Sequence, residues 1–460
     1  MLYYPVMLKD LFLAGTDYLR LDHAARRMPL SEARALTDEA RKSITRPFVL
    51  ANGQDFERVI RLMSQSPDTY PAKLAYHAVG EAQKLCDTDA NPPYGYTFSD
   101  GERLLEVSRC VLSRIMTLGF AYRVTGRREL ADRALLEMDT VCAFNDWHTA
   151  HLLDAAEMAF AVSLGADWLY DVITPEKRAY YAAKVFEYEV APATRRAPLK
   201  NWYAWSKTNW NTVCYSATLI SLLEFSDFYA EEAARCLSKA LYRMPAAFAG
   251  FEPDGVFAEG CGYWKYACSY YSYAVSSLRR FFGSDLGLSF YEGCKKVGLF
   301  PLFISTPCGA FNTGDNKNER VYSSSIFMFA SDYGEPLLTE YQKTCDYTAV
   351  RPREAALGAL WYPQEGTGTA STLPNAVHLR SRLSQEIVTV RSSYLDKNAF
   401  CFCIKGGNNF VNHGDLDIGT FVLESGGVRW AEESGPDDFQ QHNYSQFGRR
   451  YSFFRNICLL

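Results

Sequence analysis

Apolar residues recur at intervals of three and four positions from the start of the chain to about residue 335. This spacing puts them on one face of a helix, so each such segment is predicted to be an amphipathic α-helix. Many helices of similar length, joined by short links and with no strands between them, favour an α/α toroid or solenoid over a bundle. The predicted helices lie near residues 31–43, 69–86, 103–125, 127–142, 151–171, 175–190, 209–226, 229–247, 265–282 and 286–298.

The pattern changes after about residue 365, where residues 366–372 form a linker-like run of Gly, Thr, Ala and Ser. Short β-rich runs with Gly or Asn breaks follow it, and helices before strands indicate an α+β chain with segregated parts. We therefore expect a helical domain over 1–365 and a β domain over 366–460. The last residues resemble a strand in mid-course, so the β domain is expected to be incomplete or unusually small. The predicted strands are 387–391, 399–404, 420–423 and 428–430.

Composition and charge exclude several classes of protein. The chain has 460 residues, of which 48% are hydrophobic and 22% charged, which excludes general disorder. The net charge is -5 with no long basic block, so no nucleic-acid partner is expected. No apolar stretch approaches the 18 residues of a membrane span. Aromatic residues make up 15% of the chain, and such flat, hydrogen-bonding side chains are suited to holding sugars.

The thirteen cysteines and the N-terminus indicate a compartment. Most cysteines stand singly in apolar runs and no CxxC pair exists, so they are interpreted as free thiols that pack as small hydrophobes. Residues 1–8 are largely apolar, but no basic region precedes them and no small-residue cleavage site follows. We expect a cytoplasmic protein without a secretory signal.

Residues 201–211 form the first segment with candidate chemistry, because tryptophans, asparagines and a lysine gather there just before a helix. Aromatic faces stack on sugar rings, while amides and ammonium groups bind hydroxyls and carboxylates. The alternative is a helix N-cap at Thr208 or Asn209 with buried tryptophans as anchors. The candidate substrate contacts are Trp202, Trp205, Lys207, Trp210 and Asn211.

Residues 252–266 form a second segment, in which a Gly-rich turn leads into a helix that carries Tyr263, Trp264 and Tyr266 near its start. Glycines there permit close backbone approach to a ligand, and Glu259 adds a carboxylate. The alternative is an ordinary helix start with packed aromatic residues.

Histidines mark two further places. His413 begins a His-x-Asp-x-Asp run at the entry to a strand, and this pattern fits either a metal ligand set or a His–carboxylate dyad. The alternative is a structural histidine in a loop. His148 and His151 lie three residues apart at a helix start, with no Glu or Cys at a spacing that completes a metal site. We interpret them as structural or rim groups.

Taken together, these segments resemble the heparinase II/III-like polysaccharide lyases over roughly residues 100 to 455. The resemblance implies an incomplete N-terminal α/α toroid, a C-terminal antiparallel β-sandwich and an active site in the cleft between them. The matching motifs, in order, are Phe144-Asn-Asp-Trp-His148 to Gly165-Ala-Asp-Trp-Leu-Tyr170, Asn209-Trp-Asn211, Asp254-Gly with Glu259-Gly-x-Gly-Tyr-Trp264, Phe311-Asn-Thr-Gly-Asp315, His413-x-Asp-x-Asp-x-Gly-Thr-Phe421 and Trp430-Ala-Glu-Glu-Ser-Gly435.

The reaction that this resemblance implies is β-elimination beside a uronic acid. It needs a donor that neutralises the carboxylate, a base that reaches the C5 proton and an acid for the leaving oxygen. By resemblance, Asn209 is the neutraliser, Tyr263 is the acid and also a candidate base, and His413 is the base or a second neutraliser. The implied sugar contacts are Trp202, Trp205, Lys207, Trp210, Asn211, Glu259 and Trp264.

The chain also departs from the family pattern. Trp210 stands where members often have a histidine, which puts more weight on Tyr263 and His413. Asp415 replaces a second histidine that can bind a structural zinc, and Glu433 stands where members often offer another carboxylate. No cofactor is expected to be required, and Asp415 with Glu433 are the candidate ligands of a structural divalent metal.

Three functions stay open from the sequence. The leading one is a lyase acting on an acidic, uronate-containing glycan, which local cations would hold. The second is a glycoside hydrolase that uses Asp254 and Glu259 as its carboxylate pair. The third is a catalytically inactive sugar-binding protein. The sequence names neither the glycan nor the oligomeric state. The local cations are Arg195, Arg196, Lys200 and Lys207.

Overall fold

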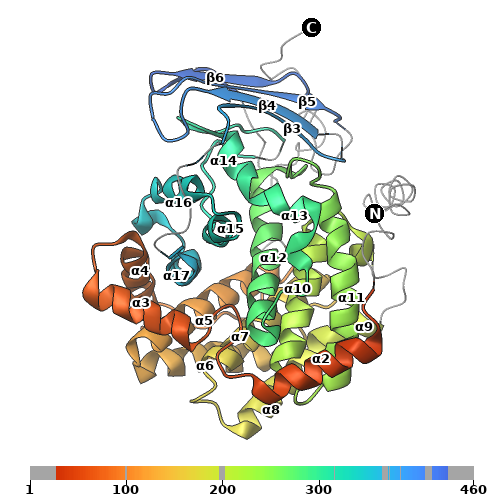
Figure 1. Cartoon of the computed structure of the whole chain (residues 1–460). Helices are drawn as coiled ribbons and strands as arrows, with labels where there is room; N and C mark the ends of the chain where they lie inside the picture. The colour runs from red at the N-terminus through yellow and green to blue at the C-terminus, as the bar shows by residue number, and fades with distance from the viewer. Residues whose placement is uncertain are drawn as a thin grey trace.

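The computed structural model has helices first and a small antiparallel sheet last (Figure 1). A mostly helical chain that ends in a small sheet confirms the coarse fold prediction. The structure describes residues 27–98, 101–195, 202–314, 316–364, 371, 373–383, 385–409 and 417–433, without the side chains of residues 195 and 205. The predicted domain boundary at 365 and 366 and the predicted strand at 456–460 lie outside these residues.

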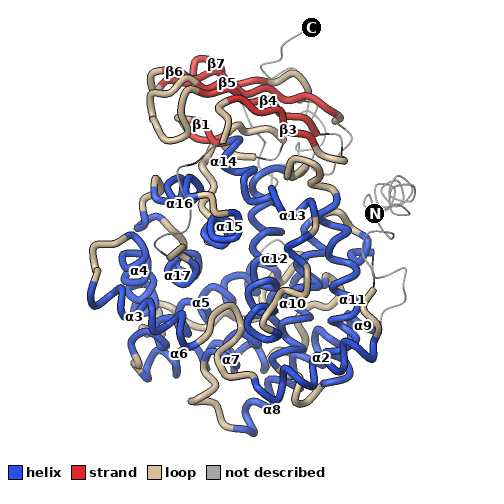
Figure 2. The backbone as a smooth tube through the Cα atoms, viewed as in Figure 1, coloured by secondary structure: helices blue, strands red, loops and turns tan. Residues whose placement is uncertain are grey.

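The described helices fill the chain as far as residue 361 (Figure 2). They are α2 (Leu30–Ser43), α3 (Gly53–Gln65), α4 (Tyr70–Lys84), α5 (Leu105–Thr125), α6 (Arg128–Cys142), α7 (Leu152–Trp168), α8 (Pro175–Val185), α9 (Ala191–Arg195), α10 (Asn209–Glu224), α11 (Ala230–Ala249), α12 (Gly260–Phe282), α13 (Glu292–Lys296), α14 (Phe300–Ile304), α15 (Ser325–Tyr333), α16 (Pro336–Lys343) and α17 (Pro352–Trp361). A π-helix, Phe186–Val190, joins α8 to α9, and a 3-10 turn, Trp202–Trp205, precedes α10.

Several helix predictions need correction. The predicted helix at 286–298 is broken into 3-10 turns around the short α13. The described helices α3, α15, α16 and α17 have no counterpart among the predicted segments. Helix α12 begins at Gly260 rather than at residue 265, because the side chain of Asn316 caps its first backbone N–H groups. The partner is distant in sequence, so periodicity alone does not reveal that start.

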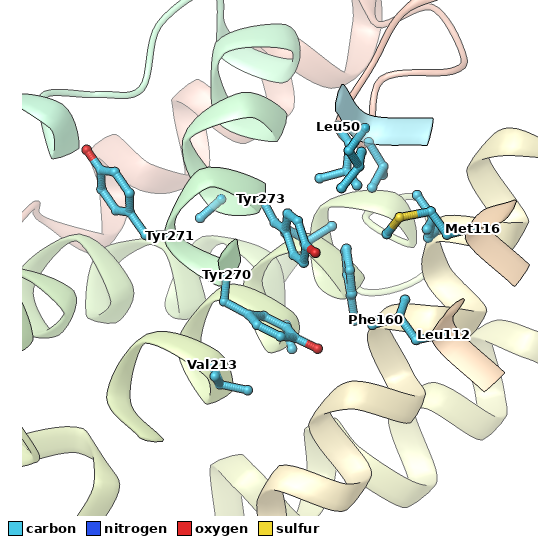
Figure 3. Close-up of a cluster of buried hydrophobic side chains, with 14 of the residues drawn as sticks. Leu50, Leu112, Met116, Phe160, Val213, Tyr270, Tyr271 and Tyr273 are labelled. Carbon is cyan, nitrogen blue, oxygen red and sulfur yellow. The ribbon is translucent and has the colours of Figure 1, made fainter. Parts of the chain in front are cut away.

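The innermost helices are buried on every side. Every residue of α7 is buried, and α10 is buried except at Trp210 and Tyr215. A helix surrounded in this way needs no polar face, which explains its weak amphipathic pattern. Aromatic rings of α7 pack against those of α12. The ring centroid of Phe160 lies 5.6 Å from that of Tyr270 and 5.1 Å from that of Tyr273 (Figure 3). Part of the high tyrosine content therefore serves helix packing.

The sheet is an antiparallel meander in the order β3-β4-β5-β6-β7. Side chains alternate along β4, with Ile387, Thr389 and Arg391 buried and Glu386 and Val390 exposed. The register pairs Ile387 with Lys405. The strands are β3 (Ala376–Arg380), β4 (Gln385–Arg391), β5 (Cys401–Gly407), β6 (Phe421–Ser425) and β7 (Val428–Ala431). Four of these five match predicted strands, and β3 was not predicted.

Buried charges fasten the sheet to the helical part through the hairpin of β1 (Ser305–Thr306) and β2 (Gly309–Ala310). The Arg391 guanidinium donates to the carbonyl of Ser305 at 2.8 Å. The Glu424 carboxylate accepts from the Thr306 hydroxyl at 2.9 Å and pairs with Arg429 at 2.6 Å. Charged hydrogen bonds of this kind are strong and directional when buried. They hold the sheet against the helices as one fixed arrangement.

Two simpler findings concern the described part of the chain. None of its helices is long and apolar enough to span a membrane. Each of its cysteines is a free thiol, and most of these thiols are buried.

Candidate active site

The N-terminal ends of α7, α10 and α12 lie together. The His151 ring, just before α7, lies 4.7 Å from the Trp210 ring at the start of α10. The Tyr266 hydroxyl, in the second turn of α12, donates to Glu157 in the second turn of α7. Each helix start carries partial positive charge, because its first N–H groups have no partners within the helix. Three helix starts at one place create a site that favours anionic groups.

Asn209 is the first residue of α10. Thr208 caps the helix by accepting a hydrogen bond from the Trp210 N–H at 3.4 Å, so the cap is Thr208 and Asn209 is released from that role. The Asn209 side chain is 4% exposed, and its amide makes no hydrogen bond within the described part of the chain. A buried amide normally has a partner. An amide without one is available to a ligand.

Tyr263 lies in the first turn of α12, and this helix begins at Gly260 in a conformation that favours glycine. Gly260 has a φ of +83°, and a Cβ there would lie 2.3 Å from the Asn316 amide nitrogen. The Asn316 Oδ1 accepts the backbone N–H of Cys261 at 2.6 Å and that of Gly262 at 3.3 Å. This contact fixes the first turn, which orients the partly buried Tyr263 ring.

His148 and His151 share one buried carboxylate. The Nδ1 atoms of the two rings lie 2.8 and 2.7 Å from the two Asp154 oxygens, and Asp154 is fully buried. Burial raises the pKa of the Asp154 carboxyl, but hydrogen bonds from His151 and His148 outweigh it and the net pKa is lowered. An imidazole held through Nδ1 by a carboxylate presents Nε2 as a base. The interpretation of both histidines as structural or rim groups did not anticipate this dyad.

An aromatic row extends from the two histidines. The His151, Trp210 and Trp202 rings follow one another, with 4.7 Å between centroids at each step. Trp202 and Trp210 are partly buried, so each keeps some surface for contact. The Phe98 ring also packs against His148, with 5.1 Å between ring centroids. Such a row of flat faces fits the prediction of sugar stacking for Trp202 and Trp210.

A charged cluster lies deeper along α7 and α12. The Arg109 Nε of α5 lies 3.1 Å from a Glu157 oxygen, and the Arg109 guanidinium lies 4.7 Å from the Tyr266 ring centroid. Burial raises the pKa of Tyr266 well above its usual range, and Glu157 raises it further. Tyr266 therefore remains a hydrogen-bond donor. Nothing in the spacing of Arg109, Glu157 and Tyr266 along the sequence indicates that they meet.

Two predicted sugar contacts are core residues instead. Trp264 is fully buried and its indole N–H donates to the Val297 carbonyl at 2.8 Å. Asn211 is fully buried and its amide donates to the carbonyls of Ala204 at 3.1 Å and Arg243 at 3.2 Å. Each follows a site residue by one or two positions, which turns its side chain toward the helix packing.

The remaining predicted site residues differ in where the structure places them. Glu259 is buried at the N-cap position of α12, and Lys207 is partly buried near α10. The Asp254 carboxylate lies 3.5 Å from the Lys296 ammonium and 3.6 Å from the Arg380 guanidinium. Asp254 thereby links the helices to β3. The side chain of Trp205 lies outside the described part.

His413 and Asp415 also lie outside the described residues. Asp417 is described and fully buried, and it accepts the Gly314 backbone N–H at 2.9 Å, two residues before the Asn316 that caps α12. Glu433 is buried and accepts a hydrogen bond from the Thr420 hydroxyl. Within the described ranges, no three potential ligands among His, Cys, Asp and Glu gather in a metal-binding geometry. The predicted metal site therefore remains a prediction.

No protein-family model matches the chain, and no curated protein matches its sequence. Solved structures do match. A heparinase III structure shares 15% identity over 95% of this chain and 66% of its own, with a TM-score of 0.50. A chondroitin AC lyase from Streptomyces coelicolor A3 shares 12% over 82% of this chain and 58% of its own, at 0.48.

A heparan sulfate lyase from Pedobacter heparinus is a further match, with 14% identity over 83% of this chain and 65% of its own, at a TM-score of 0.44. The chain thus spans about two thirds or less of the length of these three proteins. The likeness to heparinase III shows that the chain has the fold of a polysaccharide lyase, and at this identity it shows the fold alone.

Proposed function

We propose that the protein is a lyase that cleaves a uronic-acid-containing glycan by β-elimination. The observation that carries the proposal is the buried Asn209 amide, which has no hydrogen-bond partner among the described residues and stands where three helix starts meet. Such an amide, aided by the positive ends of the helices, suits the carboxylate of a uronic acid. The polysaccharide lyase fold is consistent with this proposal.

In the proposed reaction, hydrogen bonds from Asn209 neutralise the carboxylate and so make the neighbouring C5 proton more acidic. A base removes that proton, the electron pair forms the C4–C5 double bond, and the bond from C4 to the glycosidic oxygen breaks. Tyr263 gives a proton to the leaving oxygen. The aromatic row of Trp202 and Trp210 supports the sugar ring.

The base in this proposal is Tyr263 or His413. The described histidine His151 is a further candidate, because its Nδ1 is held at 2.7 Å by Asp154 and its ring touches Trp210, the neighbour of Asn209. Proton transfer by a positioned side chain contributes about 10²- to 10⁴-fold to a rate. A divalent metal held by Asp415 and Glu433 stays a separate proposal, which metal analysis of the purified protein tests.

The hydrolase alternative has less support. The Asp254 carboxylate pairs with the Lys296 and Arg380 cations, so it is already engaged in linking α13 to β3. A turnover assay distinguishes the inactive sugar-binding alternative from the lyase, because both bind the glycan and only the lyase cleaves it.

Activity on a panel of uronate polysaccharides and oligosaccharides, followed by ultraviolet absorbance, tests the proposal. The product of β-elimination contains a C4–C5 double bond that absorbs, whereas a hydrolase product has none. Asn209→Ala should lower kcat by roughly 10²- to 10³-fold, as expected for loss of one donor to a developing negative charge. Tyr263→Phe should abolish turnover while sugar binding persists.

The neighbouring asparagine is the matched control. Because the Asn211 amide supports two backbone carbonyls, Asn211→Ala should lower the free energy of unfolding by about 1–3 kcal/mol. Asn209→Ala should leave stability nearly unchanged, since the amide it removes has no partner in the described chain. Sugar cleavage without a gain in absorbance would overturn the lyase proposal, as would full activity in both Asn209→Ala and Tyr263→Phe.

A further inference from the structure

A cluster of charged and polar side chains lies next to the candidate active site, where residues of α5, α7, α12 and α17 meet. Arg109 of α5 contacts Glu157 of α7 and Tyr266 of α12. The Lys265 ammonium of α12 lies 3.4 Å from a Glu354 oxygen of α17. All four helices contribute residues from their first two turns, so their positive ends meet here.

The position of this cluster along the helices follows from helix geometry. Tyr266 is three residues beyond Tyr263 on α12, and Glu157 is six residues beyond His151 near the start of α7. At about 1.5 Å of rise per residue, the cluster begins roughly 5–9 Å further along these helices than Tyr263 and His151. One ring of a sugar chain spans a similar distance, so the cluster is adjacent to the proposed catalytic groups and separate from them.

Arg353 supplies a charge that the described protein does not neutralise. It is the second residue of α17 and is partly buried, and its guanidinium makes no hydrogen bond or ion pair within the described ranges. Although burial lowers its pKa, the nearby Tyr273, Glu354 and Glu157 raise it overall, so it stays charged. Arg109 and Lys265 each face a carboxylate, whereas Arg353 has none bound to it. Three cations against two carboxylates leave one positive charge.

Several buried polar atoms in the same place also lack partners. The Tyr270 hydroxyl is enclosed and makes no hydrogen bond, and Tyr270 is 2% exposed. Glu157 is 1% exposed, and its Oε2 has no partner while its Oε1 accepts from Arg109 and Tyr266. Most buried polar groups in proteins are satisfied, so an unpaired donor and acceptor make this cluster unusual. A ligand can reach it at the exposed parts of the Arg109 and Lys265 side chains, which are 37% and 27% exposed.

We propose that Arg353, with Arg109 and Lys265, forms a subsite for an acidic group on the sugar unit next to the one that is cleaved. A guanidinium binds a carboxylate or a sulfate ester through two parallel hydrogen bonds. This assignment deepens the proposed function, on which it rests for the identity of the larger ligand.

Binding of single sugars to the full-length protein tests the subsite without any cleavage. Glucuronate, galactose 6-sulfate and glucose are titrated separately, with affinity followed by calorimetry. At least one acidic sugar should bind about tenfold or more tightly than glucose, and the sugar that binds decides between carboxylate and sulfate. Arg353→Gln should weaken that binding about tenfold or more. It should not lower thermal stability, because the guanidinium has no described partner.

Arg351→Gln is the matched control, since Arg351 precedes α17 by one residue and is exposed. It removes the same charge close by and should leave affinity within about twofold. Equal loss in both variants would reduce the effect to general electrostatics and overturn the subsite, as would unchanged affinity in Arg353→Gln. Tyr263→Phe should bind the acidic sugar normally. If the wild-type protein binds the acidic sugar but cleaves no uronate glycan, the lyase proposal fails and the subsite stands.

Discussion

Glu189 should make the stability of this protein fall as the pH rises through neutrality. The residue lies in the π-helix that joins α8 to α9 and is fully buried. Its Oε1 is 2.5 Å from the Thr218 hydroxyl, and its Oε2 has no partner. Burial raises the pKa of Glu189 from 4.5 to about 7, against a smaller lowering by Thr218. The Thr218 hydroxyl is the donor to Glu189 Oε1, and it also lies 2.8 Å from the Cys214 carbonyl oxygen.

The sign and size follow from linkage between protonation and folding. Because the folded pKa is the higher one, the folded state binds the proton more tightly, and that advantage is complete below the unfolded pKa of 4.5. This contribution to stability falls away between pH 4.5 and about pH 7 and is absent at higher pH. A difference of about 2.5 in pKa corresponds to roughly 3 kcal/mol.

Denaturant unfolding of wild type and Glu189→Gln at about pH 5 and pH 8 measures the effect. Between these two pH values, wild type should lose roughly 2–3 kcal/mol more than the variant, because glutamine does not ionise. Glu187→Gln is the control, since Glu187 lies in the same π-helix with its side chain 60% exposed. Parallel pH curves for wild type and Glu189→Gln would refute the reasoning, as would a control that behaves like the variant.

Three further predictions concern the site and its supports. Asp154→Asn should reduce turnover about 10²-fold or more in a kcat measurement, because the Nδ1 atoms of His148 and His151 lose their shared carboxylate; unchanged kcat and pH profile would exclude both rings from the reaction. Gly260→Ala should unfold at clearly lower denaturant, since its φ of +83° disfavours other residues and a Cβ would overlap Asn316. Trp264→Phe should cost about 1–3 kcal/mol in the same assay while sugar affinity stays at the wild-type value; loss of affinity at wild-type stability would return Trp264 to the sugar contacts.

The sequence predicted the elements where local signals are strong. Helices over 103–125 and 209–226 and the strand at 387–391 match α5, α10 and β4 closely. It missed α17 and β3, where the local pattern is short and the partners are distant. The full extent of the helical ring and a second sheet, as the family resemblance implies, remain predictions.

The candidate site divides in a similar way. Residue types and spacing predicted roles for Asn209, Tyr263, Trp202 and Trp210, and these roles remain predictions. They misassigned Trp264 and Asn211, which face the packing because a helix turns by about 100° per residue.

What the sequence by itself determined is the order of helices before strands, the segments rich in aromatic and amide groups, and the general class of chemistry that those groups permit. These follow from local periodicity and residue chemistry. Only the tertiary structure decided that Asp154 holds two histidines, one of them beside Trp210, and that Arg109 meets Glu157 and Lys265 meets Glu354 between helices. These contacts depend on how helix starts that are distant in sequence pack together. Burial then sets the protonation state of each group and decides which of its hydrogen-bonding atoms stay unpaired.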